Sequence, residues 1–302
     1  MSLEPPDNEA KFSARQPRPL VSIGFPVYNG EQTVAAVLDS LLAQSLSDFE
    51  LLISDNCSTD GTQAICESYA SGDSRVRYFR QARNLGAVGN FKYVLDQASG
   101  RYFMWAASDD FRTPDFLSEN VAFLENHPDY VASTSPNCLE GEDKHVTFSM
   151  TGSMEQRFRA FFDNCWSSHG IFYSVMRTDV IRQCPVVGQH FLAADWAIDL
   201  FLASRGNVHR TEKGLTVFGV NGVSSRAGSY SAFRNSRIEW LLPFYRMSLF
   251  ALQFAEDFSI GQKAALLGTL LKLNFKAGVD QLHSGLYQFY CAHFKRKQVT
   301  AG

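Results

Sequence analysis

Two adjacent carboxylates, Asp109 and Asp110, are the residues whose types and spacing point most directly to chemistry. They follow the apolar run at residues 102–106 after one small residue and Ser108. Adjacent carboxylates repel each other unless a cation or hydrogen-bond donors offset their charge. Mg²⁺ and Mn²⁺ bind one or two protein carboxylates and fill their other positions with phosphate oxygens and water. The pair therefore predicts a divalent cation site for a phosphate-containing ligand. The alternative is that both acids simply precede the positive end of a helix.

Three further polar clusters also come at or soon after the end of an apolar run. The runs at residues 20–25, 49–54 and 76–79 are followed by Pro26 to Gly30, by Asp55 and Asn56, and by Arg83 and Asn84. If the runs are parallel strands, their carboxyl ends share one edge of a sheet, where ligands of open α/β sheets bind. Each cluster alone is also ordinary turn chemistry. The four together predict one site at that edge.

The elements that must position these clusters are strands alternating with helices. Apolar residues recur at helical spacing over 34–42, toward residue 70, through residues 94 and 95, and over 116–126. This alternation predicts crossover units and a mostly parallel sheet. Helical patterns return at 155–162 and 196–203, residues 215–219 suggest an edge strand, and the chain beyond 236 reads as helical.

Composition excludes several other classes of protein. The chain has 302 residues, is 45% hydrophobic and carries a net charge of −3, so it has no general attraction to nucleic acid. Six scattered cysteines without a Cys-x-x-Cys pair favour reduced thiols and a cytoplasmic protein. Residues 1–18 read as a disordered leader without a secretory signal, and no apolar run is long enough to span a membrane.

The four clusters together resemble the motifs of family 2 glycosyltransferases. The matching strings are FPVYN at 25–29, ISDNCSTDGT at 53–62, RNLG at 83–86 and SDD at 108–110, and the resemblance covers roughly residues 19–226. It implies an α/β fold of the GT-A type, a Rossmann-like, mostly parallel sheet flanked by helices, with a C-terminal helical extension. It also implies an inverting enzyme that transfers a sugar from a nucleotide-diphosphate donor, commonly a UDP-sugar, with Mn²⁺ or Mg²⁺.

The same resemblance assigns roles to single residues. Pro26 and Tyr28 would flank the base, Asn29 belongs to the same motif, and Asp55 would contact the base or ribose. Asp109 would face the ribose or sugar, Asp110 would bind the metal, and Arg83 would contact the nucleotide. Two alternatives stay open: Tyr28 as a strand-end packing residue, and Arg83 as a solvated surface charge. Asn84 and Gly86 are expected to shape a turn.

Asp195 is the candidate for the base that an inverting transfer needs to take the acceptor proton. It stands before a helical pattern, where the family places an acidic pair, but Ala194 replaces the acid that often precedes the base. The alternative is a helix N-cap. Asp199, one turn later, is expected at the surface or in the helix. Asn221 occupies a position where the family usually has a histidine, so a histidine metal ligand is not expected.

The second half should meet the acceptor, a saccharide or a lipid-linked sugar. His169 and Gly170 resemble the family's acceptor segment. Trp166 and Trp196 could stack on a sugar, although the core is the favoured place for both. The C-terminal leucines are expected mainly in the core. Peripheral membrane contact is the alternative, supported by Lys295, Arg296 and Lys297.

These observations predict three segments and one function. The segments are a leader (1–18), a GT-A domain (19–235) with a nucleotide-binding half (19–132) and an acceptor-binding half (133–235), and a C-terminal helical region (236–302). The function is inverting sugar transfer in polysaccharide or glycolipid synthesis, in the cytoplasm, with peripheral contact at the inner face of a membrane as an open alternative. A non-catalytic nucleotide-sugar-binding protein is the rival. A Rossmann oxidoreductase is rejected because the first strand lacks a Gly-x-Gly-x-x-Gly turn.

Overall fold

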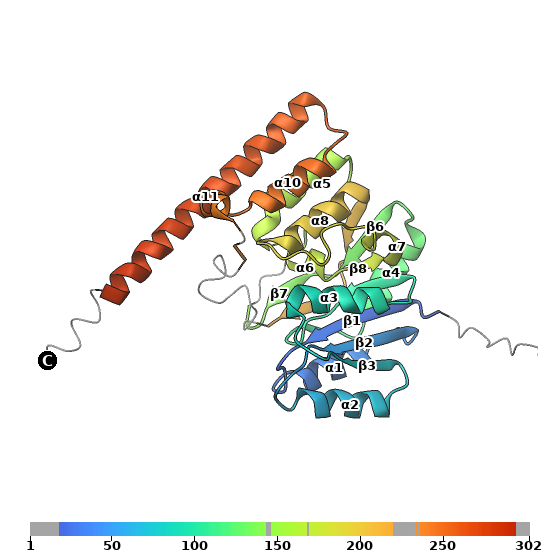
Figure 1. The fold of residues 1–302 in the computed structure, drawn as a ribbon. Helices are drawn as coiled ribbons and strands as arrows, with labels where there is room; N and C mark the ends of the chain where they lie inside the picture. The colour runs from blue at the N-terminus through green and yellow to red at the C-terminus, as the bar shows by residue number, and fades with distance from the viewer. Residues whose placement is uncertain (1–17, 143–145, 168, 220–232, 235, 294–302) are drawn as a thin grey trace, which may run out of the picture.

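A seven-stranded sheet forms the centre of the molecule in a computed structural model that describes residues 18–142, 146–167, 169–219, 233, 234 and 236–293 (Figure 1). The strand order is β3-β2-β1-β4-β8-β6-β9, and β8 alone among these strands runs antiparallel to its neighbours. This confirms the expected mostly parallel α/β sheet. The strands are β1 (Val21–Val27), β2 (Phe49–Asp55), β3 (Val76–Arg80), β4 (Tyr102–Trp105), β6 (Tyr130–Thr134), β8 (Val175–Arg177) and β9 (Asn207–Arg210).

The first half of the chain folds as the apolar pattern predicts. Each of the first three strands is followed by a helix that returns the chain to the end of the sheet where the strand began. The next strand therefore runs parallel to the earlier ones. A helix also follows β4, after the short strand β5 (Phe111–Arg112). These helices are α1 (Val34–Leu42), α2 (Thr62–Gly72), α3 (Gly86–Gln97) and α4 (Phe116–Asn126).

Alternate side chains of the sheet serve two separate hydrophobic cores. In β4, Tyr102 and Met104 pack with α1 and α4, whereas Phe103 and Trp105 pack with α3 and α8 (Ala194–Arg205) on the other face. All four side chains are fully buried. A strand buried on both faces explains why this segment reads as a continuous apolar run and not as an alternating one.

The second half contributes three strands to the same sheet, which the sequence pattern does not reveal. Residue 132, where the nucleotide-binding half was expected to end, lies inside β6. The division into two halves is therefore a proposal about function, since the central sheet runs across it. The helical elements of this half are α5 (Met154–Asn164), η1 (Cys165–Ser167), α6 (His169–Phe172), α7 (Thr178–Ile181) and α8.

A second, three-stranded sheet has the order β5-β10-β7. Strand β10 (Thr216–Phe218) was expected at a sheet edge, but it lies in the middle, between β5 and β7 (Asn137–Leu139). The prediction was wrong because the partners of β10 are only two and three residues long. Such short strands leave no readable pattern in the sequence.

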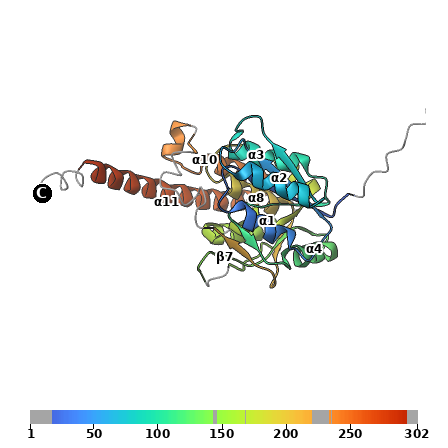
Figure 2. The same ribbon diagram turned by 90° about the horizontal axis from the view of Figure 1, so that it is seen from below.

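The C-terminal region is helical, as expected, and packs on the sheet domain. It comprises η3 (Arg237–Trp240), α10 (Tyr245–Phe254) and α11 (Ile260–His293), and α10 contacts α8 through Met247 and Ala251. Figure 1 shows α10 beside α8 and α5, and Figure 2 shows α11 reaching out past the body of the molecule.

The expectation that the C-terminal leucines are mainly core residues is only half right. Leu266 and Leu270 are buried, but Leu267, Leu271 and Phe275 are 46%, 54% and 75% exposed. Two apolar faces, one packed and one open, therefore lie on the same helix. Lys295, Arg296, Lys297, Asn221 and most of the expected leader lie outside the described residues. In the described part of the chain, no helix is both long and apolar enough to cross a bilayer.

Candidate active site

The carboxyl ends of β1, β2 and β4 meet at one edge of the central sheet. Val27 is in register with Asp55, and Gly24 is in register with Trp105. The loops after these strands therefore begin side by side. This is the convergence that the four polar clusters predicted.

The loop after β1 is tied to the loop after β2 by hydrogen bonds. The backbone N–H of Asn29 donates to Ser58 Oγ over 2.9 Å, and Asn29 Oδ1 accepts from the N–H of Thr59 over 2.9 Å. Asn29 and Cys57 have left-handed backbones, with φ of 51° and 63°. Such conformations persist in residues other than glycine when the surroundings hold them, and they concentrate at functional sites. Asn29 thus shapes the loop that presents Tyr28, which is 49% exposed.

Asp55 is fully buried and already well partnered. Its carboxylate accepts from Arg80 Nη1 at 2.6 Å, from the Tyr78 hydroxyl at 2.9 Å and from the N–H of Ser58 at 2.8 Å. Burial and this carboxylate raise the pKa of Tyr78. Pro26 is also buried, within β1. In this arrangement Asp55 organises the edge, while Tyr28 and the partly exposed Arg80 present groups to solvent. Sequence reasoning missed Arg80, which stands three residues before the motif arginine.

The predicted turn before α3 is confirmed. Asn84 Oδ1 accepts from the N–H of Gly86 at 2.8 Å and from Asn56 Nδ2 at 3.0 Å. Gly86 has φ of +73°, which glycine adopts at little cost. Arg83 lies exposed on this turn. Its position is compatible both with a nucleotide contact and with a solvated surface charge.

Asp109 and Asp110 lie in different environments. Asp109 is partly exposed, whereas Asp110 is 4% exposed and accepts from the N–H of Gly219 at 3.3 Å. Burial raises the pKa of Asp110 to about 6, and the neighbouring Asp109 adds to this while Arg112 opposes it. A Cβ on Gly219 would lie 2.6 Å from the backbone oxygen of Asp109. Only a glycine lets this segment approach the pair so closely.

The acidic pair fits a hard divalent cation. Among the described residues, Gly219 is the one hydrogen-bond donor seen for Asp110. The raised pKa of Asp110 shows that burial disfavours its ionised form, which a bound cation would stabilise. Among the described residues, no group of three or more acidic, histidine or cysteine side chains is arranged so that it could hold a metal ion. Diphosphate oxygens and water are the ligands that such a cation takes in addition to one or two protein carboxylates. Asp110 is the residue that would hold the metal, with Asp109 beside it.

Tyr173 and Arg112 lie beside the acidic pair, and neither was predicted as a site residue from the sequence. The Tyr173 ring lies 5.7 Å from the ring of Phe218, next to Gly219, and 6.0 Å from the Arg112 guanidinium. Burial raises the pKa of Tyr173 well above its ordinary value, and Asp110, Asp195 and Asp109 add to the effect. Arg112 is buried, and its Nε and Nη1 atoms have no hydrogen-bond partner among the described residues. Arg112 thus supplies a positive charge near the acidic pair, and Tyr173 supplies a hydroxyl that can donate a hydrogen bond.

Asp195, on α8, is close enough to Tyr173 for its charge to act on the phenol. It is exposed in the first turn of α8 and is not the N-cap, which is Ala193 with φ of 61°. Burial raises the pKa of Tyr173 most, and the charges of Asp110, Asp195 and Asp109 add to the effect. The predicted base and the predicted metal ligand therefore both act on one side chain.

Several neighbours differ from expectation. Asp199 was expected at the surface, but it is 1% exposed, because it lies on the inner face of α8 near the buried Arg210. Trp196 is in the core, as favoured, while Trp166 is 47% exposed and packs edge-on against Trp196 at 5.1 Å. Gly170 is buried, and a Cβ there would meet Asn137 Oδ1 at 2.5 Å. His169 begins α6, and nothing is described of its side chain.

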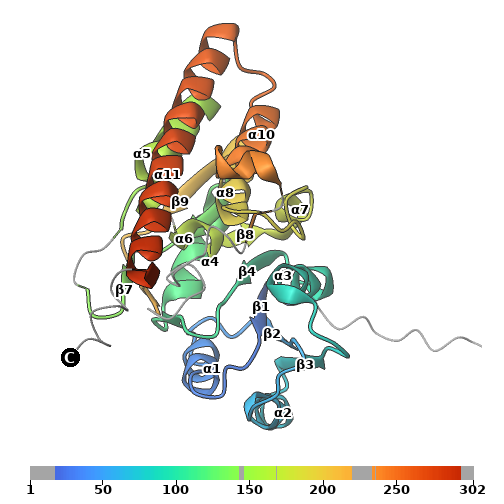
Figure 3. The ribbon, with the colours of Figure 1, turned by 60° about the vertical axis from the view of Figure 1, so that its left-hand side comes forward.

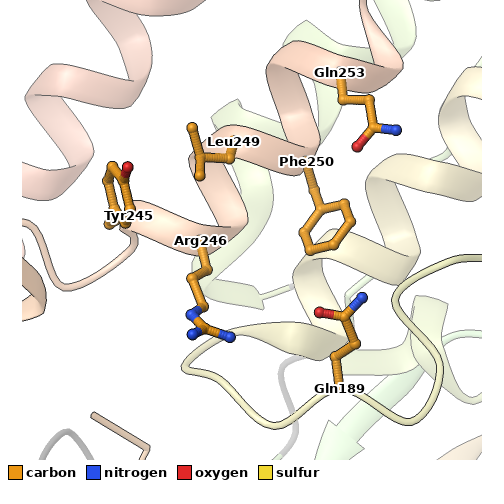
Figure 4. Close-up of a pocket in the computed structure, with 6 residues that line it drawn as sticks. All are labelled: Gln189, Tyr245, Arg246, Leu249, Phe250 and Gln253. Atoms are coloured by element: carbon orange, nitrogen blue, oxygen red, sulfur yellow. The ribbon is translucent and has the colours of Figure 1, made fainter. Parts of the chain in front are cut away.

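A shallow pocket of about 390 Å³ lies away from this edge, between α10 and the segment before α8 (Figure 4). Figure 4 shows Arg246 and Phe250 on α10 directed toward Gln189. Arg246 is paired with Glu239 at 3.2 Å. The residues of the acidic pair do not line the pocket, so it is separate from the candidate active site.

Comparison with known proteins identifies the class of this chain. The family model described as "Glycosyl transferase family 2" matches residues 22–182, and the chain belongs to that family. Putative glycosyltransferase EpsE of Bacillus subtilis strain 168 is 36% identical over 113 residues, which are 37% of this chain and 41% of that protein. The chain therefore matches less than half of the length of this relative.

Solved structures show the same fold. A crystal structure of S. aureus TarS in complex with UDP-GlcNAc has a TM-score of 0.64 at 20% identity, covering 83% of this chain and 71% of that one. The mannosyltransferase PcManGT from Pyrobaculum calidifontis, in complex with GDP-Man and Mn²⁺, has a TM-score of 0.52 at 16% identity, covering 94% and 83%. The fold is therefore of the GT-A type, as the motifs predicted.

Proposed function

We propose that this chain is an inverting glycosyltransferase that moves a hexosyl group from a nucleotide-diphosphate sugar to an acceptor hydroxyl. The observation that carries the proposal is the convergence of the loops after β1, β2 and β4 at one edge of the sheet, with Asp109 and Asp110 in the loop after β4 and the charge of Asp195 acting on the nearby Tyr173. An inverting transfer needs a site for the diphosphate and a base on the other side of the anomeric carbon. The two halves of the chain supply one each.

Each side chain has a defined part in this proposal. Tyr28 packs on the base, and Asn29 and Asp55 hold the loops that form the base and ribose site. Asp109 faces the ribose or sugar, Arg83 contacts the nucleotide, and Asp110 holds Mn²⁺ or Mg²⁺. When bound, such a cation neutralises the charge on the departing diphosphate. Asp195 takes the proton from the attacking hydroxyl.

UDP is the proposed nucleotide. Its support is the fold shared with TarS, which was crystallised with UDP-GlcNAc, while PcManGT was crystallised with GDP-Man and Mn²⁺. We propose a saccharide or lipid-linked acceptor in polysaccharide or glycolipid synthesis. The proposed location is the cytoplasm, where an enzyme can meet such acceptors at the inner face of a membrane.

The test is release of UDP from a panel of UDP-sugars, including UDP-GlcNAc, with water or added saccharides as the acceptor. Wild-type protein should release UDP with Mn²⁺ and not with EDTA. Asp110→Asn should lower the rate at least about 100-fold, because the cation loses its charged ligand. Asp96→Asn, an exposed acid paired with Lys92 on α3, is the matched control and should retain the wild-type rate.

Asp195→Asn separates transfer from binding. It should lower saccharide-dependent turnover by about 100-fold or more while UDP affinity stays unchanged. Equal turnover in wild-type and Asp195→Asn would exclude this residue as the base. Nucleotide binding without turnover in the wild-type protein, for every donor, would favour the non-catalytic binding protein, for which Ala194 in place of an acid is the supporting feature.

A further inference from the structure

The open face of helix α11 carries a continuous apolar stripe. Leu267, Leu271, Phe275, Val279 and Leu282 are 46%, 54%, 75%, 48% and 68% exposed. Their spacings of four, four, four and three residues keep them on one side of a helix with 3.6 residues per turn. Exposed apolar side chains gathered in this way mark a contact surface, whereas single ones need no explanation.

The stripe is not a fault in packing, because the opposite side of α11 is well buried. Leu266, Leu270, Leu273 and Ala277 are at most 8% exposed and belong to the core shared with α8 and α10. The helix has 34 residues, so it is roughly 50 Å long at 1.5 Å per residue. Figures 2 and 3 show it lying along the helical end of the molecule with one side open.

Charge at the margins of the stripe indicates what it contacts. Between Ile260 and Leu282 the helix carries Lys263, Lys272 and Lys276 and the single acid Asp280, which gives three positive charges less one negative, a net +2. The three lysines are exposed, and the whole chain has a net charge of −3. Lysines beside an exposed apolar face are typical of helices that lie in the surface of an anionic bilayer.

Trp240 and Leu241 add to this surface from the neighbouring segment. They are 61% and 77% exposed, and the backbone oxygen of Leu241 approaches Gly278 of α11. Tryptophan favours the boundary between lipid and water, because its ring has an apolar body and a polar N–H. The exposed apolar surface therefore extends from α11 onto the neighbouring segment.

A second copy of the chain fits the stripe less well. Paired helices need apolar residues at alternating spacings of three and four, and a strict repeat continued from Leu267 and Leu271 would place Asn274 and Gly278 in the seam. Asn274 is buried and bonded to Phe244 N and Ser248 Oγ, so it belongs to the packed side. The stripe is not built as a coiled-coil seam.

We propose that α11 docks this protein on an anionic phospholipid surface, with Leu271 and Phe275 at the centre of the buried stripe and the lysines at the headgroups. The docking does not depend on the sugar-transfer activity. It would hold the enzyme at the surface where lipid-linked sugars are found.

Vesicle flotation with the full chain tests this proposal. The protein should float with vesicles of phosphatidylcholine and phosphatidylglycerol, and float much less with phosphatidylcholine alone or in 0.5 M NaCl, because salt screens the lysines. The double variant Leu271→Glu, Phe275→Glu should lower the bound-to-free ratio at least tenfold. The double variant Ala265→Glu, Thr269→Glu is the matched control, since it adds the same charge elsewhere on α11, and its ratio should stay within about threefold.

Circular dichroism and the melting temperature show whether each variant is folded, and light scattering shows whether a second copy covers the stripe. Absence of flotation by the wild-type protein would overturn the proposal, as would equal flotation of the Leu271, Phe275 variant. A dimer in the absence of vesicles that Phe275→Glu converts to a monomer would assign the stripe to self-association instead. Equal binding to neutral and anionic vesicles would contradict the role of the lysines.

Discussion

At the scale of single residues, Tyr173 is the point where the two halves of the candidate site meet. Its ring is held by Phe172 at 4.9 Å and Phe218 at 5.7 Å, so its orientation is fixed by packing. Burial, with the charges of Asp110, Asp195 and Asp109, raises the pKa of Tyr173 well above its ordinary value, so its phenol stays neutral and can donate a hydrogen bond. Such a donor suits an anionic ligand oxygen or a carboxylate.

Tyr173→Phe should therefore lower kcat by about tenfold or more with little loss of stability, since hydrogen bonds to charged groups contribute roughly 1.5 to 3 kcal/mol. The ring and its contacts remain in this variant. Steady-state kinetics with UDP-sugar and a melting curve measure the two effects. An unchanged kcat would show that the hydroxyl has no part in the reaction.

The buried Asp110 carboxyl predicts a dependence of stability on pH. Its pKa is raised from 3.8 to about 6, so the folded chain binds this proton more tightly than the unfolded chain. The free energy of unfolding consequently falls as pH rises from about 4 to about 6, and the loss is complete above that range. Asp110→Asn removes this cost and preserves an oxygen for the N–H of Gly219.

Without added metal, Asp110→Asn should be more stable than wild type by up to about 3 kcal/mol at pH 7.5 and by about half as much at pH 5. Urea unfolding at the two pH values measures the difference. Asp96→Asn is again the control, because that side chain is exposed. A stability gain that does not change with pH would show that Asp110 is not held in a desolvated state.

Sequence reasoning found the acidic pair and the loops but not every residue that surrounds them. Asp55, Asp109 and Asp110 stand in distinctive strings directly after strands, so their place at the edge follows from topology alone. Arg112 lies in the two-residue strand β5, which no motif marks. Tyr173 follows α6 and ends the segment of His169 and Gly170, but the resemblance assigned no role to this tyrosine. Asp199 shows the converse, because a charged residue on a helix reads as exposed until the packing is known.

At the scale of elements, β3 ends in an ion pair at the sheet edge that carries the candidate site. Arg80 Nη1 lies 2.6 Å from Asp55 Oδ2, and the Asp55 side chain is fully buried while that of Arg80 is 34% exposed. The arginine also donates to the backbone oxygen of Ser58 at 3.0 Å. The pair therefore holds the end of β2 and the loop that follows it.

Arg80→Met should reduce the free energy of unfolding clearly more than Arg77→Met does, because it leaves a buried carboxylate without its cation. Arg77→Met is the control on the same strand. Arg77 pairs with Glu50 at 2.9 Å but is 45% exposed, so its loss should cost less than about 1 kcal/mol. Urea unfolding compares the two variants, and equal losses would contradict a special role for the Arg80 pair.

The elements of the first half could be predicted, and those of the second half only in part. Strands β1, β2 and β4 are buried on both faces and at least four residues long, so each gives an apolar run. Strand β8 has three residues and the partners of β10 have two and three. Segments this short show no readable alternation of apolar and polar residues, and they form strands because they pair with neighbours in the folded chain.

At the scale of the whole molecule, one sheet joins the proposed nucleotide site, the helix that carries the proposed base and a helical end with an open apolar stripe. The proposed base, Asp195, lies on α8, which packs against both the sheet strand β6 and helix α10. Membrane docking through α11 and sugar transfer at the sheet edge would thus belong to one packed body. The mostly parallel sheet and the edge where its loops converge could be anticipated from the sequence, whereas the open face of α11 could be recognised only from the packing.

The central claim is that a cation on Asp110 anchors a sugar nucleotide at the sheet edge, and a thermal-shift measurement tests it most directly. UDP and Mn²⁺ together should raise the melting temperature of the wild-type protein by about 4 to 8 °C at a UDP concentration 100 times its dissociation constant. UDP with EDTA should give little shift, and Asp110→Asn should give none with either. An equal shift by UDP with and without Mn²⁺, or a full shift in Asp110→Asn, would contradict the claim.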